Sequence, residues 1–229
     1  MCKGHHGFLY LIWQDPRSRR NYTVGKLSKG DTFVFEYYGE YEEARKAGWD
    51  YLKAFPEQKR YESPTLFAAF ASRLPDPKRR GIEGILQKYG LSEYDGYELL
   101  RESTGRLPID TYAFIDPILP EDEEVEREFY VAGVRHSSEC LGRDCGGRPP
   151  VSNGDELTLL REPENEHDEF AVRMLASSGE LVGYVPRYYS KGISDRLDRK
   201  MPYSCKIIGI DREHNCGTCL KVRLSIPGM

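Results

Sequence analysis

The sequence predicts an α+β protein of two domains: a small sheet with several short helices, then a small β-barrel or sandwich with one or two helices. Strand patterns occur in both halves, whereas helical spacing is frequent only in the first half. The stretch DPILPEDEEVERE, residues 116–128, separates the halves and is poor material for a core. With 229 residues, each half is long enough to bury its own core. We therefore expect domains at residues 1–118 and 129–229, joined by an acidic linker at residues 119–128.

Residues 1–118 contain three expected strands, followed by helices. GFLYLIWQD and NYTVGKLSKGDTFVFEYY predict the strands, with a turn at KGD. Apolar residues then recur at helical spacing over residues 40–55, which predicts an amphipathic helix that ends at Pro56. Shorter helices are expected in TLFAAFASRL, GIEGILQKYG and DGYELLRESTG. Residues typical of helix ends bound them: Pro75 for the first, Gly90 for the second, Asp95 and Gly105 for the third.

Residues 129–229 follow a different pattern. Short apolar segments separated by tight turns such as SSGE predict strands: FYVAGV, ELTLLRE, EFAVRMLA, ELVGYV, YSCKIIGID and CLKVRLSI. One helix is expected in RYYSKGISDRLDR, where Tyr189, Ile193 and Leu197 lie four residues apart. Many short strands with one or two helices are typical of a small barrel or sandwich.

The charge is unevenly distributed along the chain. The formal net charge is −4, and residues 121–128 alone hold six acids and one arginine. Residues 1–120 carry 18 Lys and Arg against 17 Asp and Glu, and residues 129–229 carry 14 of each. The neutral C-terminal half can therefore hold a local positive face for nucleic acid. The longest apolar run, FLYLIW, is too short for a membrane span or a signal peptide, so we expect a cytoplasmic protein without a membrane partner.

The order of motifs in the second half resembles the HIRAN domain. FYVAGVRH opens the pattern at residues 129–136, LLREPENEHDEFAVRML follows at 159–175, and GELVGYVPR completes it at 179–187. The resemblance extends over residues 127–229 and implies a modified small β-barrel related to the OB fold. HIRAN domains occur fused to Swi/Snf-type helicases and alone in bacteria. The best-described members hold the 3′ end of single-stranded DNA, so the resemblance implies DNA binding by this half.

The chemistry of a 3′ end suggests roles for side chains in these motifs. The carboxylate of Asp168 can accept a hydrogen bond from the terminal hydroxyl, and it would repel a 3′ phosphate. Arg135 and Arg187 are suited to phosphates, and Arg161 is a further candidate. Asn165 offers both a donor and an acceptor to base, sugar or phosphate. The alternative is purely structural, with Asn165 and Asp168 capping the backbone of a turn.

Three flat side chains complete the expected DNA site. His136, His167 and Tyr184 present rings on which exposed bases can stack. His136 and His167 stand where well-studied members of the family carry aromatic residues, so stacking should be weaker here and dependent on pH.

The first half resembles the N-terminal subdomain of HipA-type serine/threonine kinases over residues 8–118. VGKLSKGDTFVFEYY, SPTLFAAFASRLPDPKRR and GRLPIDTYAFIDPI carry the resemblance, above all residues 73–76 with Phe67 and Phe70. It implies that this half docks a separately encoded HipA-type kinase. The sequence has neither a kinase catalytic loop nor a glycine-rich phosphate loop before a lysine, so we expect no kinase activity. The basic residues 78–80 would touch a kinase or DNA, or are simply a solvated first turn.

Four cysteines in the second half have a spacing that suits zinc. CLGRDC supplies Cys140 and Cys145, and NCGTC supplies Cys216 and Cys219. Together they would form a tetrahedral structural Zn²⁺ site without an open coordination position. The alternative is two pairs of reduced thiols. The acidic run at residues 162–168 lacks the glycine turn and regular spacing of a calcium loop, so we expect no Mg²⁺ or Ca²⁺ site there.

These patterns lead to two main functional hypotheses. The first is a non-enzymatic, antitoxin-like regulator that docks a HipA-type kinase and binds single-stranded DNA at its 3′ end. The second is a stand-alone nucleic-acid-binding module in DNA repair or phage defence. A third hypothesis, a nuclease or phosphatase that uses the acids of residues 162–168, lacks a matched nucleophile and base in the sequence.

Overall fold

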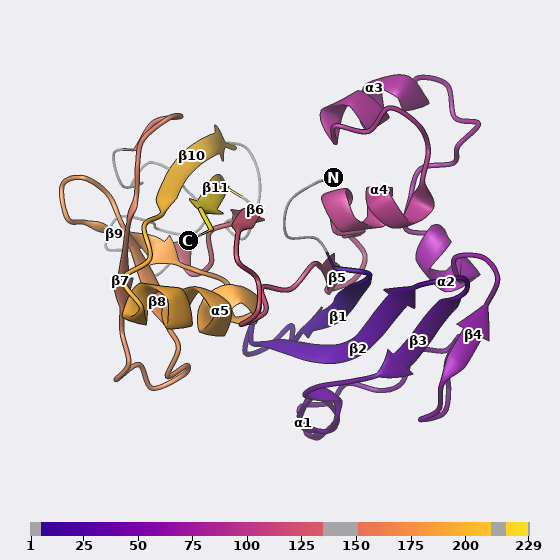
Figure 1. Cartoon of the computed structure of the whole chain (residues 1–229). Coiled ribbons are helices and arrows are strands. Elements are labelled where there is room, and N and C mark those ends of the chain that lie inside the picture. Colours follow the sequence, from indigo (N-terminus) through magenta and orange to yellow (C-terminus); the bar gives the residue numbers. More distant parts are fainter. Residues whose placement is uncertain (1–5, 135–150, 212–218, 229) are drawn as a thin grey trace. The chain divides into compact units, whose positions relative to one another are not determined.

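The structure is a computed structural model that describes residues 6–134, 151–211 and 219–228 (Figure 1). The chain divides between Pro117 and Ile118 into two compact units, which we call the N-terminal and C-terminal units. Sheets with a few helices make up both, so the predicted α+β class is confirmed. Among the described residues, no helix is both long enough and apolar enough to cross a membrane.

The N-terminal unit is built on a five-stranded antiparallel sheet in the order β4-β3-β2-β1-β5. The strands are β1 (Phe8–Gln14), β2 (Asn21–Lys29), β3 (Phe33–Tyr37), β4 (Tyr61–Ser63) and β5 (Tyr112–Ile115). Alternation along the strands buries Leu9, Val24 and Phe35 completely on one face. Phe70 of α2 (Ala68–Ala71) and Tyr97 of α4 (Gly96–Ser103) pack into the same core. Phe70, 2% exposed, is therefore a core residue.

Two of the predicted helix ends are confirmed atom by atom. The side chain of Asp95 accepts hydrogen bonds from the backbone N–H groups of Tyr97 and Glu98, which caps α4. At the end of α3 (Ile82–Lys88), Gly90 adopts φ of +71°, a conformation that glycine tolerates best.

The helix expected over residues 40–55 is much shorter than predicted. Only α1 (Tyr41–Lys46) forms, because Gly48 adopts φ of +100° and turns the chain away from the helix axis. The N–H of Gly48 donates to the carbonyl of Arg45 at 3.0 Å, and that of Trp49 donates to Ala44 at 2.9 Å. These bonds satisfy the last helical carbonyls and end the helix. The apolar residues beyond Gly48 that suggested a helix reach the core from an irregular segment.

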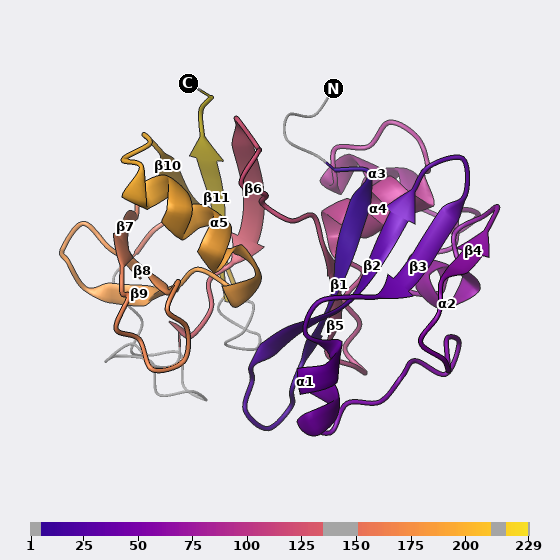
Figure 2. The same ribbon diagram turned by 60° about the horizontal axis from the view of Figure 1, so that its bottom comes forward.

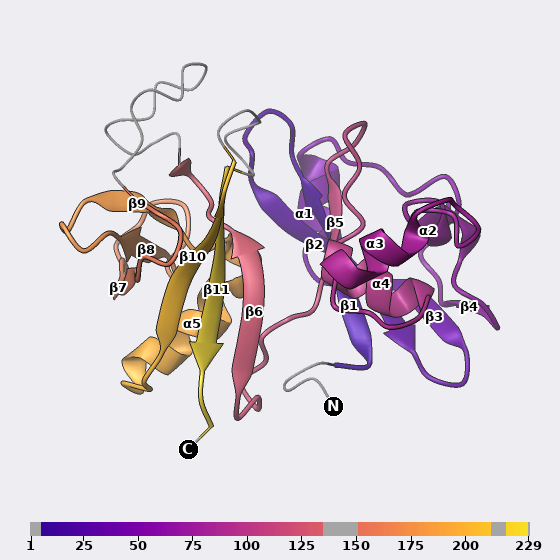
Figure 3. The same ribbon diagram turned by 90° about the horizontal axis from the view of Figure 1, so that it is seen from above.

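The C-terminal unit contains two three-stranded antiparallel sheets, in the orders β10-β11-β6 and β7-β8-β9 (Figure 3). A strand overlaps each segment predicted for this half, although β6 starts four residues before the predicted FYVAGV and ends at its second residue. The strands are β6 (Val125–Tyr130), β7 (Thr158–Arg161), β8 (Val172–Leu175), β9 (Leu181–Tyr184), β10 (Ser204–Ile210) and β11 (Leu220–Ile226). The predicted helix is α5 (Arg187–Asp198).

The expected OB-like barrel is not found as a closed, continuously hydrogen-bonded sheet among the described residues. The edges of the two sheets approach at isolated bridges, one between Ala132 and Tyr184 and one between Glu156 and Lys206. Just before β7 the N–H of Leu157 donates to the carbonyl of Cys205 in β10 at 2.8 Å, and within β7 the hydroxyl of Tyr203 accepts from the N–H of Leu159 at 2.9 Å. The strands therefore form two joined sheets rather than one even barrel.

The acidic segment at residues 119–128 is not a linker along its whole length. Its last four residues begin β6, in which Val125 and Arg127 are buried while Glu126 and Glu128 face outward. The alternation of inward and outward residues that is typical of a strand cannot be recognised in this sequence, because the outward-facing Glu126 and Glu128 and the inward-facing Arg127 are all charged. Residues 119–122 are also anchored, since the buried guanidinium of Arg196 on α5 donates to the carbonyls of Leu119 and Asp122 at 2.8 and 2.6 Å.

Helix α5 packs closely against the start of this unit. A Cβ atom placed on Gly192 would lie 2.7 Å from both the carbonyl oxygen and a methyl carbon of Ile118. Tyr189, one turn earlier, contacts Phe129 of β6 with ring centroids 5.5 Å apart. The helix therefore has a fixed position relative to the sheets, and its first turn can support a site.

Candidate nucleic-acid interface

The loop between β7 and β8, residues 162–171, has a compact backbone of its own. The N–H of Glu162 donates to the carbonyl of Ala171 at 2.9 Å and closes the base of the loop. Within it, the N–H of Asn165 donates to Glu162 and that of Ala171 donates to Asp168. The loop is thus a sequence of tight turns, of the kind that asparagine and aspartate favour.

Asn165 organises the first half of the loop. Its side-chain oxygen accepts hydrogen bonds from the N–H groups of His167 and Asp168, at 3.0 and 3.2 Å. Its side-chain nitrogen donates to a carboxylate oxygen of Glu162 at 2.6 Å. Both ends of the amide are therefore engaged within the loop, as the structural alternative expected.

Asp168 connects the loop to α5. One carboxylate oxygen accepts from the N–H of Phe170 at 3.0 Å, and the other accepts from the hydroxyl of Ser190 at 2.7 Å. Ser190 is 2% exposed, whereas Asp168 keeps part of its surface open. Asp168 is therefore held at both oxygens and still borders solvent.

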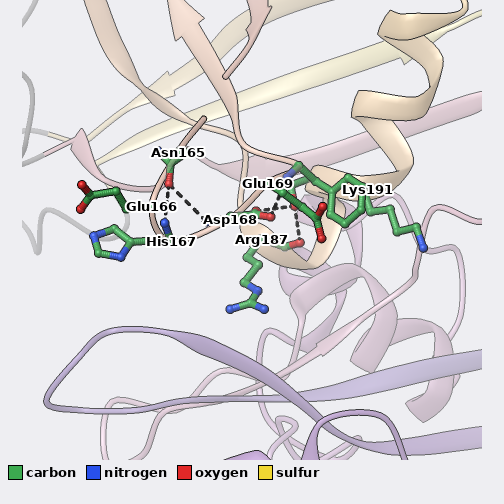
Figure 4. A pocket seen from close by; sticks show the side chains of 9 residues that line it. Asn165, Glu166, His167, Asp168, Glu169, Arg187 and Lys191 are labelled. Carbon is green, nitrogen blue, oxygen red and sulfur yellow. Dashed lines mark hydrogen bonds between the residues drawn. The ribbon is translucent and has the colours of Figure 1, made fainter. Parts of the chain in front are cut away.

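The loop and the first turn of α5 enclose an open hollow of about 440 Å³ (Figure 4). Its lining combines one partly open carboxylate, two cations and an exposed imidazole: Asp168, Arg187, Lys191 and His167. In Figure 4 the side chains of His167 and Arg187 extend away from the loop backbone. The ammonium of Lys191 lies 5.4 Å from the ring centre of Phe170. The hollow also receives Glu166 and Glu169, so its rim carries both signs of charge.

Four of the expected DNA-binding residues line this one hollow, namely Asn165, His167, Asp168 and Arg187. Two other expected residues lie outside its lining. Arg161 donates to the carboxylate of Asp198 at 3.1 Å and to the carbonyl of Glu169 at 3.2 Å, so it stabilises the loop. Arg135 and His136 lie outside the described residues.

Tyr184, the second expected residue away from the hollow, lies in β9. It pairs with Arg173 in the neighbouring strand β8. Partial burial, and next the nearby carboxylate of Glu162, raise the pKa of its hydroxyl above the ordinary value. Tyr184 therefore stays neutral and belongs to the polar base of the loop.

The sequence alone did not point to Ser190 or Lys191. Both follow Arg187 on α5 at helical spacing, three and four residues later, which places them on the same side of the helix. This spacing could have indicated from the sequence that Lys191 lies beside Arg187. The contact between Ser190 and Asp168 joins elements 22 residues apart, and no local pattern predicts it.

Three of the four proposed zinc ligands lie outside the residues that the structure describes. They are Cys140, Cys145 and Cys216. Cys219 is described and is 3% exposed, directly before β11. Over residues 6–134, 151–211 and 219–228, no group of three or more potential metal ligands comes together. The zinc site stays a prediction.

Comparison with known proteins supports the resemblance seen in the C-terminal half. Residues 125–226 match the model of the HIRAN domain family, so the prediction of a HIRAN domain is confirmed. The expected HipA-like subdomain at residues 8–118 gains no support, and kinase docking stays a prediction.

Three individual proteins are similar to parts of the chain. A Fanconi-associated nuclease 1 homolog from Arabidopsis thaliana is 31% identical over 58 residues, which is 25% of this chain and 6% of that protein. The crystal structure of the HIRAN domain of human HLTF aligns with a TM-score of 0.36 and 17% identity, over 46% of this chain and 79% of that one. A Lactobacillus plantarum protein aligns with a TM-score of 0.35 and 17% identity, over 45% of this chain and 96% of that one.

Proposed function

We propose that the HIRAN domain makes this chain a nucleic-acid-binding module that holds single-stranded DNA by its 3′ end. The observation that carries the proposal is the hollow where the loop of residues 162–171 meets α5. There a fixed carboxylate, two cations and an exposed ring surround one open space. A 3′ terminus has a hydroxyl donor, phosphodiesters and an unstacked base, and the lining offers a partner to each.

The two cations of α5 suit the phosphates that precede a 3′ end. Arg187 and Lys191 are four residues apart and so lie on one face of the helix, at the wall of the hollow. Guanidinium and ammonium groups form strong charge-assisted hydrogen bonds to phosphate oxygens. These contacts fix the register of a strand without reading its sequence.

Asp168 suits the terminal hydroxyl. Each of its oxygens accepts one hydrogen bond from the protein, and a carboxylate oxygen can accept about two. A 3′ hydroxyl can therefore donate to Asp168 without displacing Phe170 or Ser190. A 3′ phosphate would bring negative charge against a carboxylate that is already fixed in place. The site should therefore prefer the hydroxyl form.

His167 supplies the surface for the last base. Its imidazole is exposed, and neither a hydrogen bond nor a ring contact holds it among the described residues. Base stacking on protein rings contributes about 1–3 kcal/mol per base. A single imidazole should contribute at the low end of that range, so affinity rests mainly on the phosphates.

The test compares two fluorescent single strands that differ only at the 3′ end, one with a hydroxyl and one with a phosphate. We expect tighter binding of the hydroxyl strand. Arg187→Gln with Lys191→Gln should weaken both strands by about tenfold or more and should lower the salt dependence. The matched control is Lys206→Gln, which removes an exposed cation paired with Glu156 away from the hollow. Equal affinity for the two strands, or equal loss in the control, would sink the proposal.

We further propose that the domain binds DNA without cleaving it. Asp168 and Glu162, two acids of the loop, hold the backbone and the side chain of Asn165 in place. A labelled strand incubated with the protein and Mg²⁺ or Mn²⁺ should keep its length. Shortened products that disappear in Asp168→Asn would show an enzyme instead.

A further inference from the structure

The hairpin between β1 and β2 presents three arginines on a loop of six residues, DPRSRR at residues 15–20. We refer to it as the arginine hairpin. β3 pairs with β2 only from Gly25 to Lys29, so this end of the hairpin extends past β3 (Figure 2). Arg17, Arg19 and Arg20 are all exposed. The side chains at the tip are therefore accessible to a partner.

Asp15 holds the backbone of the arginine hairpin in one conformation. Its carboxylate accepts from the N–H of Arg17 at 3.0 Å, from the N–H of Ser18 at 3.1 Å and from the hydroxyl of Ser18. Its main chain pairs with Arg19 and Arg20, at 2.8 and 2.9 Å. The bond from Ser18, followed by that from Arg17, holds the pKa of Asp15 below its ordinary value. The charged carboxylate is thus the centre of the loop.

Two of the three guanidinium groups lack an ion-pair partner within the described residues. Arg20 lies 3.7 Å from a carboxylate oxygen of Glu40 and 4.9 Å from the ring centre of Tyr22. Arg17 and Arg19 form no ion pair or ring contact in this part of the chain, although Arg17 acts electrostatically on the carboxylate of Asp15. Arg19 adopts φ of +64°, which residues with a side chain seldom adopt. Glycine or asparagine would fit this backbone conformation better than the arginine that stands there.

We infer that the arginine hairpin is a second nucleic-acid contact, which binds the phosphodiester backbone without reference to its ends. Exposed, unpaired guanidinium groups on a fixed loop match the chemistry of phosphate recognition. Because the loop is already ordered, binding does not carry the cost of ordering the backbone. The inference goes beyond the 3′-end site and stands on different residues, so either can fail alone.

The probe is a dumbbell DNA, a short duplex closed by a loop at each end. It has no 3′ terminus that the hollow beside Asp168 could bind. The intact chain should bind it, and Arg17→Gln with Arg19→Asn should bind it about tenfold more weakly. The slope of log affinity against log salt should fall by about 2, since each lost phosphate contact accounts for about 0.9. Arg187→Gln with Lys191→Gln should leave dumbbell binding unchanged.

Two controls separate a specific loop from net charge. Lys53→Gln with Lys88→Gln removes the same charge from two other exposed positions of the N-terminal unit. Asp15→Ala makes the protein more positive, yet it should weaken dumbbell binding because the loop loses its centre. A melting curve checks that each variant is folded. If Asp15→Ala does not fold, the result for Arg17→Gln with Arg19→Asn alone decides the test. No binding of the dumbbell by the intact chain, an equal loss in the lysine control, or tighter binding by folded Asp15→Ala would each overturn the inference.

Discussion

Asn165→Asp changes the shape of the side chain very little, so its effect on stability depends on what the oxygen and the nitrogen of the Asn165 amide each contact. The oxygen end accepts from the N–H groups of His167 and Asp168, and a carboxylate would keep both bonds. The nitrogen end lies 2.6 Å from a carboxylate oxygen of Glu162, and there the change replaces a donor with a second negative charge. The substitution should therefore destabilise the loop through this one contact.

The magnitude can be bounded from the geometry. Two unit charges about 4 Å apart near a protein surface interact by about 4 kcal/mol, using an effective dielectric constant of about 20. Asn165 and Glu162 are both partly exposed, so solvent should reduce the repulsion to about half of that value. The lost hydrogen bond to Glu162 adds about 1 kcal/mol. We expect a loss of about 2–3 kcal/mol in the free energy of unfolding of the C-terminal unit at neutral pH.

The effect should depend on pH in a defined direction. Repulsion raises the folded-state pKa of the paired carboxyls above their unfolded values, so the folded state binds a proton more readily. The penalty is complete above the raised pKa and is relieved as pH falls toward about 4.5.

Urea unfolding of the intact chain, followed between pH 5 and 8, measures this difference. The matched control is Asn153→Asp, an exposed asparagine of the same unit, which should cost about 0.5 kcal/mol or less. Equal stability of Asn165→Asp and the unsubstituted chain at pH 7, or a penalty that does not shrink at low pH, would refute the reasoning.

Three further changes test other contacts. Gly192→Ala would place a methyl 2.7 Å from the carbonyl oxygen of Ile118, so it should lower stability by about 2 kcal/mol or more in thermal melting. Ser190→Ala removes the donor at 2.7 Å from Asp168 and should lower the preference for a 3′ hydroxyl over a 3′ phosphate, measured by fluorescence anisotropy. Burial acts to raise the pKa of Glu128, but hydrogen bonds from Lys221 and Arg223 outweigh it and lower the pKa. Glu128→Gln should therefore cost up to about 1 kcal/mol at pH 7, and its difference from the unsubstituted chain should shrink and vanish as pH falls through the lowered pKa of Glu128.

The kinase hypothesis for the N-terminal half is tested separately. If residues 8–118 dock a HipA-type kinase, a kinase encoded beside this chain should co-purify with it after co-expression. The control is the isolated kinase passed over the same affinity resin. Independent elution of the two chains would count against docking.

Local patterns predicted most strands and several helix ends because local chemistry decides them, but the short strands β4 and β5 were not predicted. Asp95 caps its helix and Gly90 ends another, as the sequence indicated. The helix predicted over residues 40–55 is shorter in the structure, because Gly48 stands at a helical position of the apolar pattern and yet its positive φ ends the helix. A glycine inside a periodic segment fits either role, and only the packing around it selects one.

The candidate site was predictable as a list of residues but not as an arrangement. Asn165 and Asp168 belong to a motif that the sequence shows directly. That Asp168 is held by Ser190, and that Lys191 stands at the same wall, depends on how α5 packs across the loop. Contacts between distant elements arise from tertiary packing, which the spacing of residues within one element does not encode.

The hydroxyl of Tyr203 has a consequence for the solution behaviour of the protein. It occupies the N–H of Leu159 on β7, at the outer edge of the β7-β8-β9 sheet. An edge strand with open N–H groups can recruit a strand from another molecule and begin aggregation. The phenol of Tyr203 therefore blocks one site for strand addition beside the loop of residues 162–171, next to the exposed side chain of Leu160.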